Sequence, residues 1–347
     1  MMEEYPLISV IIPMRNEAGW IGACLGSILA QDYPRERFEV IVVDGDSDDD
    51  SPRVLASYGE QIRVFSNPRR IVPTAMNIGI RAARGEIVTR VDAHTVLDPG
   101  YLRAGVDALK RSGADNVGGP MISVGGGKQG DAIAAAMASR FGIGAYFHFG
   151  TEDSEVDTVY MGMYPRQVFE RIGLFDEELV RNQDDELNYR LRKAGGRVFM
   201  TPRMQSRYQN RQSIKALARQ FFQYGEWKIR VLQKHPMQMS WRHFVPPALV
   251  LSLALLFILA PFVRGAGVLL ALELAAYVAG ICFATASVSG GKDLDFKLRV
   301  ALAFATMHLS WGSGFLVGVI RFGRCWFIPE SAPPRLEPAT SAEATAD

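Results

Sequence analysis

The feature that most constrains this chain is a succession of three long apolar runs in its C-terminal part. They cover residues 244–263, 266–288 and 298–320, and each is about long enough to cross a hydrocarbon core of roughly 30 Å. A buried helical core is the alternative, but three runs separated only by short polar breaks favour membrane spans. We therefore expect three transmembrane helices within residues 244–320. Residues 321–347 lead into a stretch rich in Pro, Ala, Glu and Thr, and we expect a disordered tail there.

A basic segment stands directly before the first apolar run. Between residues 201 and 243, nine Lys and Arg residues stand against one acid, Glu226. Ile214, Leu217 and Phe221 recur there at helical spacing, which predicts an amphipathic helix on membrane lipid headgroups; an ordinary solvated helix is the alternative. Basic residues beside a span are typical of the cytoplasmic side, so we expect a multi-pass protein of the cytoplasmic (inner) membrane with its N-terminal domain in the cytoplasm.

Arg321 and Arg324 follow the third run and fit this topology less well. Either the tail is an exception to the charge rule, or one of the three segments is re-entrant.

Overall charge and cysteine content exclude several other classes of protein. The formal net charge of the 347 residues is +1, which does not favour a nucleic-acid-binding protein. The three cysteines lie far apart and form no CxxC pair, as expected in a reducing compartment and without a zinc site.

Residues 1–200 alternate between strand-like and helix-like segments. Strand-like runs are apolar throughout, and each is followed by a segment with helical periodicity, which predicts an α/β domain with a mostly parallel sheet and helices on both faces. The expected strands are 7–12, 38–43, 62–65 and 86–91, and the expected helices include 18–30, one opening at Ser51-Pro52, and 73–83.

Polar residues cluster where three of these strands end. Arg15-Asn16-Glu17 follows the first strand, residues 44–49 follow the second, and Asp92-Ala93-His94 follows the fourth. The carboxyl ends of parallel strands lie at one edge of a sheet, where ligands bind. These clusters therefore predict a binding site at that edge.

The residue types suit a nucleoside diphosphate sugar. Carboxylates suit a base and a ribose, whereas a diphosphate needs a cation. Asp92 and His94 are candidates for one or two ligands of Mg²⁺ or Mn²⁺. The alternatives are an Asx turn at Asp92 and, for residues 44–50, acids that favour the start of a helix.

A further acidic group, Asp184-Asp185-Glu186, opens an amphipathic segment. Asp184 or Asp185 either caps this helix or acts as a general base on an acceptor hydroxyl, and periodicity leaves the two readings equal.

These strings together resemble the family 2 glycosyltransferases of the GT-A fold over about residues 6–236. The resemblance rests on Val10-Ile-Ile-Pro-Met-Arg-Asn-Glu17, Val42-Val-Asp-Gly-Asp-Ser-Asp-Asp49, Asn77-Ile-Gly-Ile80, Asp92-Ala-His94, Gly173-Leu-Phe-Asp-Glu177 and Asp184-Asp-Glu-Leu187. Arg90-Val-Asp-Ala-His94 and Lys234-His-Pro236 are similar to the ExoA-type branch of succinoglycan biosynthesis.

The resemblance implies an inverting hexosyltransferase that moves a sugar, with glucose from UDP-glucose as the expected donor, onto a polyprenyl-diphosphate-linked saccharide. It implies that Pro13, Arg15, Asn16 and Glu17 line the nucleotide pocket and that Asp44 contacts the uracil. Asp46 would lie in the same donor loop, with Arg70 and Asn77 as further donor-side candidates. Asp92 would lie by the ribose and the metal, and Asp184 would be the catalytic base.

Two departures from the family pattern affect this transfer. His94 stands where the family's metal-binding motif has a second Asp, and Gln183 stands where Glu often precedes the base. The Gln-x-x-Arg-Trp motif of processive synthases is absent, which favours single-sugar addition. Two alternatives stay open: a sugar nucleotidyltransferase, although its Gly-rich, Lys-containing loop is missing, and a non-catalytic membrane scaffold with a degenerate transferase domain.

Overall fold

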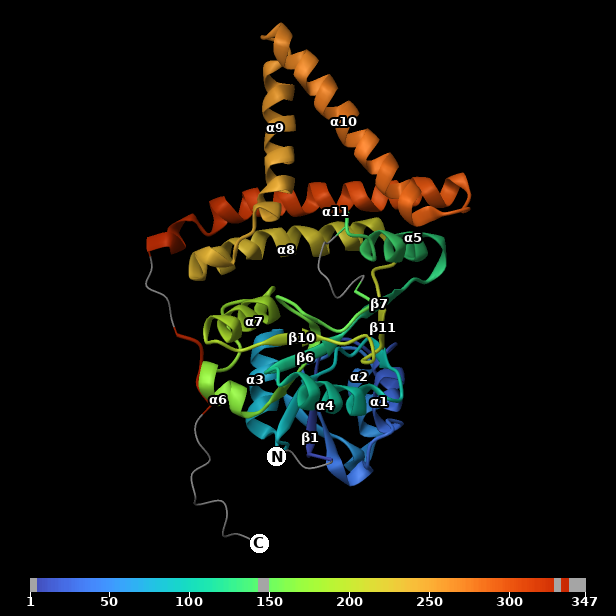
Figure 1. The fold of residues 1–347 in the computed structure, drawn as a ribbon, viewed down its shortest axis with the longest axis vertical. Coiled ribbons are helices and arrows are strands. Elements are labelled where there is room, and N and C mark those ends of the chain that lie inside the picture. The colour runs from blue at the N-terminus through green and yellow to red at the C-terminus, as the bar shows by residue number, and fades with distance from the viewer. Residues whose placement is uncertain (1–4, 143–149, 328–331, 337–347) are drawn as a thin grey trace. The chain divides into compact units, whose positions relative to one another are not determined.

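The computed structural model describes residues 5–142, 150–327 and 332–336, and the chain divides into two compact units (Figure 1). The first unit comprises residues 1–121, 150–207 and 331–347, and the second comprises residues 122–149 and 208–330. The division after residue 207 lies near the domain boundary expected at residue 200. Residues 122–142 lie within the range expected for the N-terminal domain and group with the second unit.

The first unit is built on an eight-stranded mixed sheet with the order β3-β2-β1-β4-β9-β6-β10-β8. Its strands are β1 (Ile8–Met14), β2 (Phe38–Asp44), β3 (Arg63–Ser66), β4 (Ile87–Arg90), β6 (Asn116–Gly119), β8 (Ser154–Glu155), β9 (Tyr160–Pro165) and β10 (Val198–Met200). A second sheet has the order β5-β11-β7, from Thr95–Leu97, Ser206–Gln209 and Met121–Val124.

The four expected strands are present and pair in parallel. β1 pairs with both β2 and β4, and β2 pairs with β3, so the polar segments after β1, β2 and β4 share one edge. The sheet becomes mixed at β9, which runs antiparallel to both β4 and β6. The α/β prediction is thus confirmed, with antiparallel strands added at one side.

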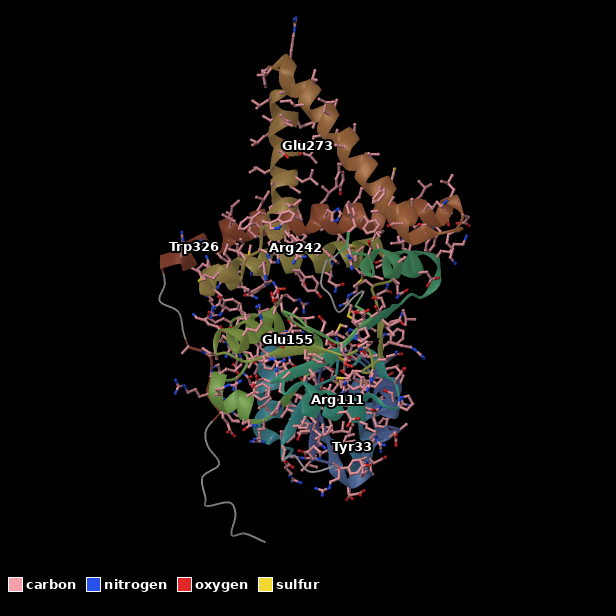
Figure 2. The ribbon with its side chains drawn as sticks, in the orientation of Figure 1. Tyr33, Arg111, Glu155, Arg242, Glu273 and Trp326 are labelled. Carbon is pink, nitrogen blue, oxygen red and sulfur yellow. The ribbon has the colours of Figure 1, made fainter. Side chains whose placement is uncertain are left out.

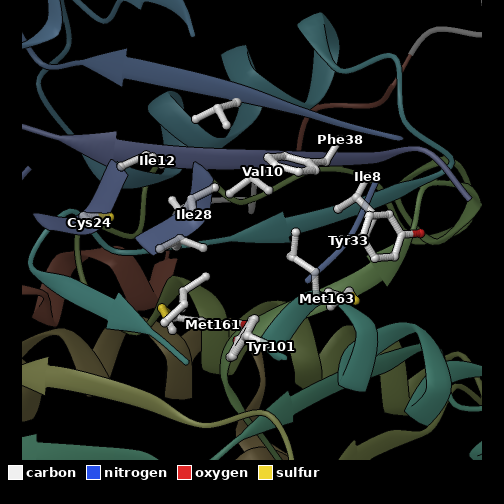
Figure 3. Close-up of a cluster of buried hydrophobic side chains, with 14 of the residues drawn as sticks. Ile8, Val10, Ile12, Cys24, Ile28, Tyr33, Phe38, Tyr101, Met161 and Met163 are labelled. Carbon is white, nitrogen blue, oxygen red and sulfur yellow. The ribbon is translucent and has the colours of Figure 1, made fainter. Parts of the chain in front are cut away.

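Helices cover this sheet, and the apolar strands are buried because both faces are covered. The helices of the first unit are α1 (Ile21–Leu29), α2 (Ser51–Ala56), α3 (Val72–Ala82), α4 (Tyr101–Ser112), α6 (Gln167–Ile172) and α7 (Gln183–Lys193). Every residue of β1 is buried. In Figure 3 the side chains of Ile12, Cys24 and Ile28 gather in the core on one face of β1.

The packing of α3 on β1 depends on a glycine. A Cβ placed on Gly79 would lie 2.5 Å from Cγ2 of Ile11, so no larger residue fits without movement of the strand or the helix. This close approach brings the beginning of α3 and the loop before it to the edge that carries the polar clusters.

The second unit consists mainly of helices. They are α5 (Gly127–Met137), α8 (Ile214–Lys234), α9 (Val245–Leu259), α10 (Arg264–Ser289) and α11 (Leu294–Arg321). Short 3-10 turns lie at Arg35–Arg37, Gly59–Gln61, Pro236–Gln238, Trp241–Phe244 and Gly323–Phe327. Within the described residues, three helical segments are long and apolar enough to cross a membrane: Trp241–Leu259, Arg264–Ser289 and Leu294–Arg321. They mark the chain as a membrane protein.

Candidate functional site

The loops after β1 and β2 are tied together by reciprocal hydrogen bonds. The Asn16 side-chain amide donates to Asp48 Oδ1 at 2.6 Å, and the Asp48 backbone N–H donates to Asn16 Oδ1 at 3.0 Å. The Ala18 N–H donates to Asp49 Oδ2 at 3.1 Å. Asp48 and Asp49 therefore tie the two loops together, through the Asn16 side chain and the Ala18 backbone.

Asp44 ends β2, next to Met14 at the end of β1. Its Oδ1 accepts from Ser47 Oγ at 2.5 Å, which orients the carboxylate without burying it. A hollow of about 300 Å³ opens beside Asp44, and the rest of its lining is Pro52, Leu55, Ala56, Gly59 and Val64. A carboxylate on a largely apolar recess is an arrangement that suits a planar base with N–H donors.

Asp46 and Arg70, predicted separately on the donor side, form an ion pair. Both have a positive φ, 58° in each case, a strained conformation for residues with a side chain. About half of each side chain remains exposed. The pair therefore links the loop after β2 to the loop before α3 at the surface of the site.

Asp92 follows β4 and is held by Arg90. Arg90 Nε donates to Asp92 Oδ1 at 2.7 Å, and both side chains are 14% exposed. Burial is the largest single influence on Asp92 and would raise its pKa, but the Arg90 guanidinium, His94 and a hydrogen bond from Tyr160 together lower that pKa below its usual range. Asp92 is thus an ionised carboxylate in a largely enclosed position.

Asp184 lies on the other side of the same guanidinium. Arg90 Nη1 is 3.9 Å from Asp184 Oδ2, although β4 and α7 are more than 90 residues apart in sequence. Desolvation by the surrounding protein raises the pKa of Asp184, and Asp185 and Asp92 add to the shift, while Arg90 opposes it. The Asp184 side chain is 43% exposed, so a solute can reach it.

The capping alternative for Asp184 does not describe this helix start. The N-cap of α7 is Asn182, in a left-handed conformation, and the helix begins at Gln183. Asp184 lies inside the first turn, where its Oδ1 accepts the Asp185 N–H at 2.9 Å. The start of the helix presents a carboxylate where the helix dipole favours negative charge, which partly offsets desolvation.

A buried ion pair fixes α7 in place. Arg190 Nε and Nη2 donate to the two carboxylate oxygens of Glu186 at 2.5 and 2.9 Å. Arg190 also donates to the carbonyls of Ile172 and Leu174 at 2.5 and 2.8 Å. Arg190 therefore ties α7 to the carbonyls of the segment that precedes it in the chain, which supports the position of Asp184 at the start of the helix.

His94 is bonded to Glu17, a residue that we expected in the nucleotide pocket. His94 Nδ1 lies 3.1 Å from Glu17 Oε1, and both side chains are about one-fifth exposed. A carboxylate on one ring nitrogen of a histidine is the usual arrangement that orients the other nitrogen toward a metal. Asp92 and His94 offer an oxygen and a nitrogen donor of the types that Mn²⁺ and Mg²⁺ sites use, and a cation held by them stays a prediction.

Protein side chains alone do not complete a metal site. Over the described ranges, no group of three or more His, Cys, Asp and Glu residues is arranged to hold an ion. Mg²⁺ and Mn²⁺ readily take phosphate oxygens and water as ligands, so two protein ligands are compatible with a cation that arrives with a diphosphate.

Pro13 and Asn77 lie apart from the solvent-facing part of the site, whereas Arg15 is exposed on it. Pro13 is buried within β1 opposite Val43. The Asn77 amide is fully buried, donates to the Phe175 carbonyl and Glu177 Oε1, both at 2.9 Å, and accepts from the Phe175 N–H. Asn77 therefore anchors the 175–177 loop, and a donor contact from it stays a prediction.

Arg90 is the residue of this site that sequence reasoning missed. It stood within the string 90–94, but only Asp92 and His94 were given roles. A signal was present, because an arginine as the last residue of a buried strand requires a carboxylate partner.

The comparisons with known proteins agree with this geometry. Residues 9–173 match the profile of "Glycosyl transferase family 2". The succinoglycan biosynthesis protein ExoA of Rhizobium meliloti is 28% identical over 326 residues, which cover 91% of this chain and 96% of ExoA. A Methanococcus voltae protein named dolichyl N-acetyl-alpha-D-glucosaminyl phosphate 3-beta-D-2,3-diacetamido-2,3-dideoxy-beta-D-glucuronosyltransferase is 28% identical over 245 residues, covering 67% of this chain and 76% of that protein.

A solved structure shares the fold. The mannosyltransferase PcManGT from Pyrobaculum calidifontis, in complex with GDP-Man and Mn²⁺, superimposes with a TM-score of 0.59 at 20% identity, covering 90% of this chain and 87% of that one. These similarities favour a transferase over the nucleotidyltransferase and the scaffold that the sequence left open. The chain carries a family 2 glycosyltransferase domain of the GT-A fold, and it is a hexosyltransferase.

Proposed function

We propose that this protein is an inverting glycosyltransferase that moves glucose from UDP-glucose onto a polyprenyl-diphosphate-linked saccharide, in the synthesis of an exopolysaccharide or cell-surface polysaccharide. One observation carries the proposal. The Arg90 guanidinium lies 2.7 Å from Asp92 and 3.9 Å from Asp184. It therefore brings together a carboxylate at the donor edge of the sheet and a carboxylate at the start of α7. The anomeric carbon of the donor would lie near these two acids.

On the donor side, the nucleotide would occupy the edge formed by the loops after β1 and β2. Asp44 would accept from the N–H of the uracil, with the apolar wall of the neighbouring hollow against the ring. Arg15, Asn16 and Glu17 would line the pocket, and the buried Pro13 would support it from within β1. The Asp46–Arg70 pair supports this role because it offers both a carboxylate and a guanidinium at the surface of the same pocket.

On the acceptor side, Asp184 would act as the general base. Its carboxylate takes the proton of the acceptor hydroxyl while the hydroxyl oxygen forms a bond to the anomeric carbon. The bond between that carbon and the diphosphate oxygen breaks on the opposite face, and UDP leaves with the electron pair. One displacement inverts the configuration, so an α-linked donor gives a β-linkage. The raised pKa of Asp184 supports this role, because a stronger base accepts the proton more readily.

Asp92 and His94 would hold a divalent cation that neutralises the developing charge on the diphosphate when it is bound. Glu17 would orient the imidazole of His94 through the 3.1 Å contact. Asp92 is kept ionised by Arg90, which is the state that a cation requires.

The relatives and the apolar helices support the proposed acceptor and location. The names of the relatives place one in succinoglycan biosynthesis and another on a dolichyl-linked sugar phosphate. A long-chain lipid acceptor would explain why a transferase domain is joined to helices able to cross a membrane. We place the protein in the cytoplasmic membrane with the first unit in the cytoplasm, where nucleotide sugars are made.

The role of Asp184 is tested by Asp184→Asn, with Asp185→Asn as the matched control one residue along the helix. We expect Asp184→Asn to lower sugar transfer by about 10²- to 10⁴-fold, the usual contribution of a general base. Asp185→Asn removes the same charge and should change transfer only a few-fold. Near-normal transfer by Asp184→Asn would refute the assignment of the base.

The donor is tested by incubating membranes that contain the protein with a panel of labelled nucleotide sugars and counting label in the extracted lipids. We expect label from UDP-glucose. Label from GDP-mannose alone would overturn the choice of UDP-glucose while leaving the transferase assignment intact.

A further inference from the structure

The helix α11 is joined to α8 along its C-terminal half. A Cβ on Gly225 of α8 would lie 2.1 Å from the Trp311 carbonyl oxygen, and one on Gly314 of α11 would lie 2.0 Å from that of Phe222. Gly318 packs in the same way on the Glu226 carbonyl. Only glycine permits two helix backbones to approach so closely, so this pairing is built into the sequence.

Polar contacts show the direction of the pair. Arg321 Nη1 lies 2.7 Å from Glu226 Oε1, and Gln233 Nε2 donates to the Phe322 carbonyl at 2.7 Å. Residues later in α8 therefore contact residues later in α11, so the two helices run parallel. They lie side by side in Figure 1.

The N-terminal half of α11 is held by α5. Arg299 Nη1 donates to Gln129 Oε1 at 3.2 Å, and Lys128 Nζ lies 3.6 Å from Asp295 Oδ2. The rings of Phe141, just after α5, and Phe304 meet edge to face at 5.5 Å. The whole of α11 is thus attached to α8 and to the α5 segment.

The partner helix α8 is poorly suited to the interior of a membrane. Its 21 residues include six charged side chains distributed along its length: Lys215, Arg219, Glu226, Lys228, Arg230 and Lys234. Charges inside a hydrocarbon core are costly, so α8 belongs at the level of the headgroups or outside it. Because α11 is in parallel backbone contact with α8, both helices must have the same orientation relative to the membrane. If α11 stood across the bilayer, α8 would be drawn in with it.

The face of α11 opposite α8 is apolar and exposed. Leu298, Leu302, Leu309 and Ile320 are 62%, 49%, 38% and 82% exposed. At 100° per residue these four positions fall within about 40° of one another, so they form one stripe. We call it the α11 stripe. A helix with one face on protein and an apolar stripe on the other is suited to lie in the plane of a membrane surface.

The helices α9 and α10 have a different environment. In an apolar 18-residue stretch of each segment, 6% of Trp241–Leu259 and 11% of α10 are buried against other parts of the protein, compared with 39% of α11. They form a hairpin that leaves the α8–α11 pair and returns to it (Figure 1), joined by a hydrogen bond of 2.5 Å from Ser252 Oγ to Glu273 Oε1. In Figure 2, Glu273 lies along this hairpin, whereas Arg242 and Trp326 lie at the level of α11.

The distribution of basic residues and the contact made by the tail both indicate that the chain crosses the membrane an even number of times. Arg264 is the cation near the tip of the hairpin, whereas Arg242, Lys292 and Lys297 flank its base, the pattern expected if the tip is translocated. After α11, the chain contacts the first unit, to which residues 331–347 belong: the Leu174 N–H donates to the Pro334 carbonyl at 2.8 Å. This bond requires the tail and the first unit to be on the same side of the membrane.

We propose that only α9 and α10 cross the bilayer, as a hairpin, and that α11 lies with α8 along the membrane surface, with the α11 stripe inserted among the lipid chains. This replaces the three spans that the apolar runs suggest. The partner of the stripe is the phospholipid bilayer itself. Arg321 and Arg324 then need neither an exception to the charge rule nor a re-entrant segment, because both arginines lie at the surface on which the basic residues gather.

Topology is tested with single cysteines in full-length protein that carries Cys282→Ala and Cys325→Ala, since Cys24 is buried. The three exposed sites are Glu60→Cys in the first unit, Gly265→Cys at the hairpin tip and Arg335→Cys in the tail. A membrane-impermeant maleimide is applied to sealed vesicles of each orientation. We expect positions 60 and 335 to be labelled from one side and position 265 from the other. Labelling of 335 together with 265 would overturn the proposal, as would labelling of all three from one side.

The orientation of α11 is tested by the depth of spin labels at Leu298→Cys, Leu309→Cys and Ile320→Cys, measured from their relative accessibility to oxygen and to a nickel chelate. A surface helix gives similar depths at all three. A spanning helix separates positions 298 and 320 by about 33 Å along the membrane normal and makes 309 the deepest. Labels at Val268 and Val278 of α10 are the matched control and should differ in depth by up to about 15 Å. An α11 profile like that of α10 would refute the surface position.

Discussion

Replacing Arg90 with Gln should change the ionisation of Asp184 and the pH dependence of the enzyme. Two unit charges separated by 3.9 Å, as Arg90 and Asp184 are, interact by roughly 4 kcal/mol at an effective dielectric constant of about 20. Because the Asp184 side chain is 43% exposed, solvent screening reduces this to about 1 kcal/mol, the upper end for exposed pairs. One pKa unit corresponds to about 1.4 kcal/mol, so the expected shift is about half a unit to one unit.

The sign follows from the charges. Asp184 acts as a base only when ionised, so activity is lost as the pH falls through its pKa, which already lies above the ordinary range of an aspartate. Arg90 opposes that rise. Without it the pKa rises further, and the acid limb of kcat/KM moves to higher pH.

The assay is the pH profile of kcat/KM for sugar transfer, measured for the wild type, Arg90→Gln and the control Arg81→Gln, which removes an exposed arginine of α3. We expect the acid limb to move upward only in Arg90→Gln. A limb that stays in place, or moves to lower pH, would refute the electrostatic link between Arg90 and Asp184.

The same substitution should also destabilise the fold, because it leaves Asp92 buried without its cation. Breaking a buried pair from one side typically costs about 3–5 kcal/mol. Thermal unfolding followed by circular dichroism measures this loss. The double variant Arg90→Gln with Asp92→Asn removes the unpaired charge and should recover part of it. A double variant no more stable than the single one would contradict this account.

Three further changes have outcomes set by the structure. Gly119→Ala places a Cβ 1.6 Å from the Met204 carbonyl oxygen and should lower the free energy of unfolding by about 1–3 kcal/mol or more, measured by thermal unfolding. The control Gly26→Ala has open space around the new Cβ and should not lower it. Asn77→Leu leaves the backbone groups of Phe175 without their partners and should cost roughly 1–3 kcal/mol for each unsatisfied group, measured in the same way; an unchanged melting temperature would show that the loop is held otherwise. His94→Asp should move metal activation from Mn²⁺ toward Mg²⁺ in a titration of transfer activity, and an unchanged preference would count against the imidazole as a ligand.

Much of the first unit could be predicted from local patterns. The largely apolar runs at residues 7–12 and 38–43 appear as β1 and β2, within about two residues at each end, because a strand buried on both faces carries few polar residues. The polar residue in each run, Ser9 and Glu39, bonds to the other across the two strands. The parallel order then places every polar cluster that follows a strand at one edge. The antiparallel direction of β9 was not predicted, since the burial pattern of a strand does not reveal the direction of its neighbours.

Within the site, the sequence predicted which segments gather but not which side chains pair. Asp48 and Asp49 belonged to an acidic cluster, yet Asp48 bonds to the Asn16 side chain and Asp49 to the Ala18 backbone N–H of the neighbouring loop. Glu17 was expected at the nucleotide and bonds to His94. Each of these contacts depends on a side-chain direction that follows only from the packing of two loops against each other.

The sequence by itself determined the alternation of strands and helices, the edge that carries the polar residues, and the presence of helices apolar enough for a membrane, because each of these is a pattern of local burial. Only the tertiary structure decided that Arg90 joins Asp92 to Asp184 and that α11 lies against α8. Those pairings connect residues separated by roughly 90 positions, and the backbone approach at Gly225 and Gly314 depends on the geometry of two helices together. Hydropathy measures one helix at a time, whereas the side of a helix that faces lipid is set by what covers its other side.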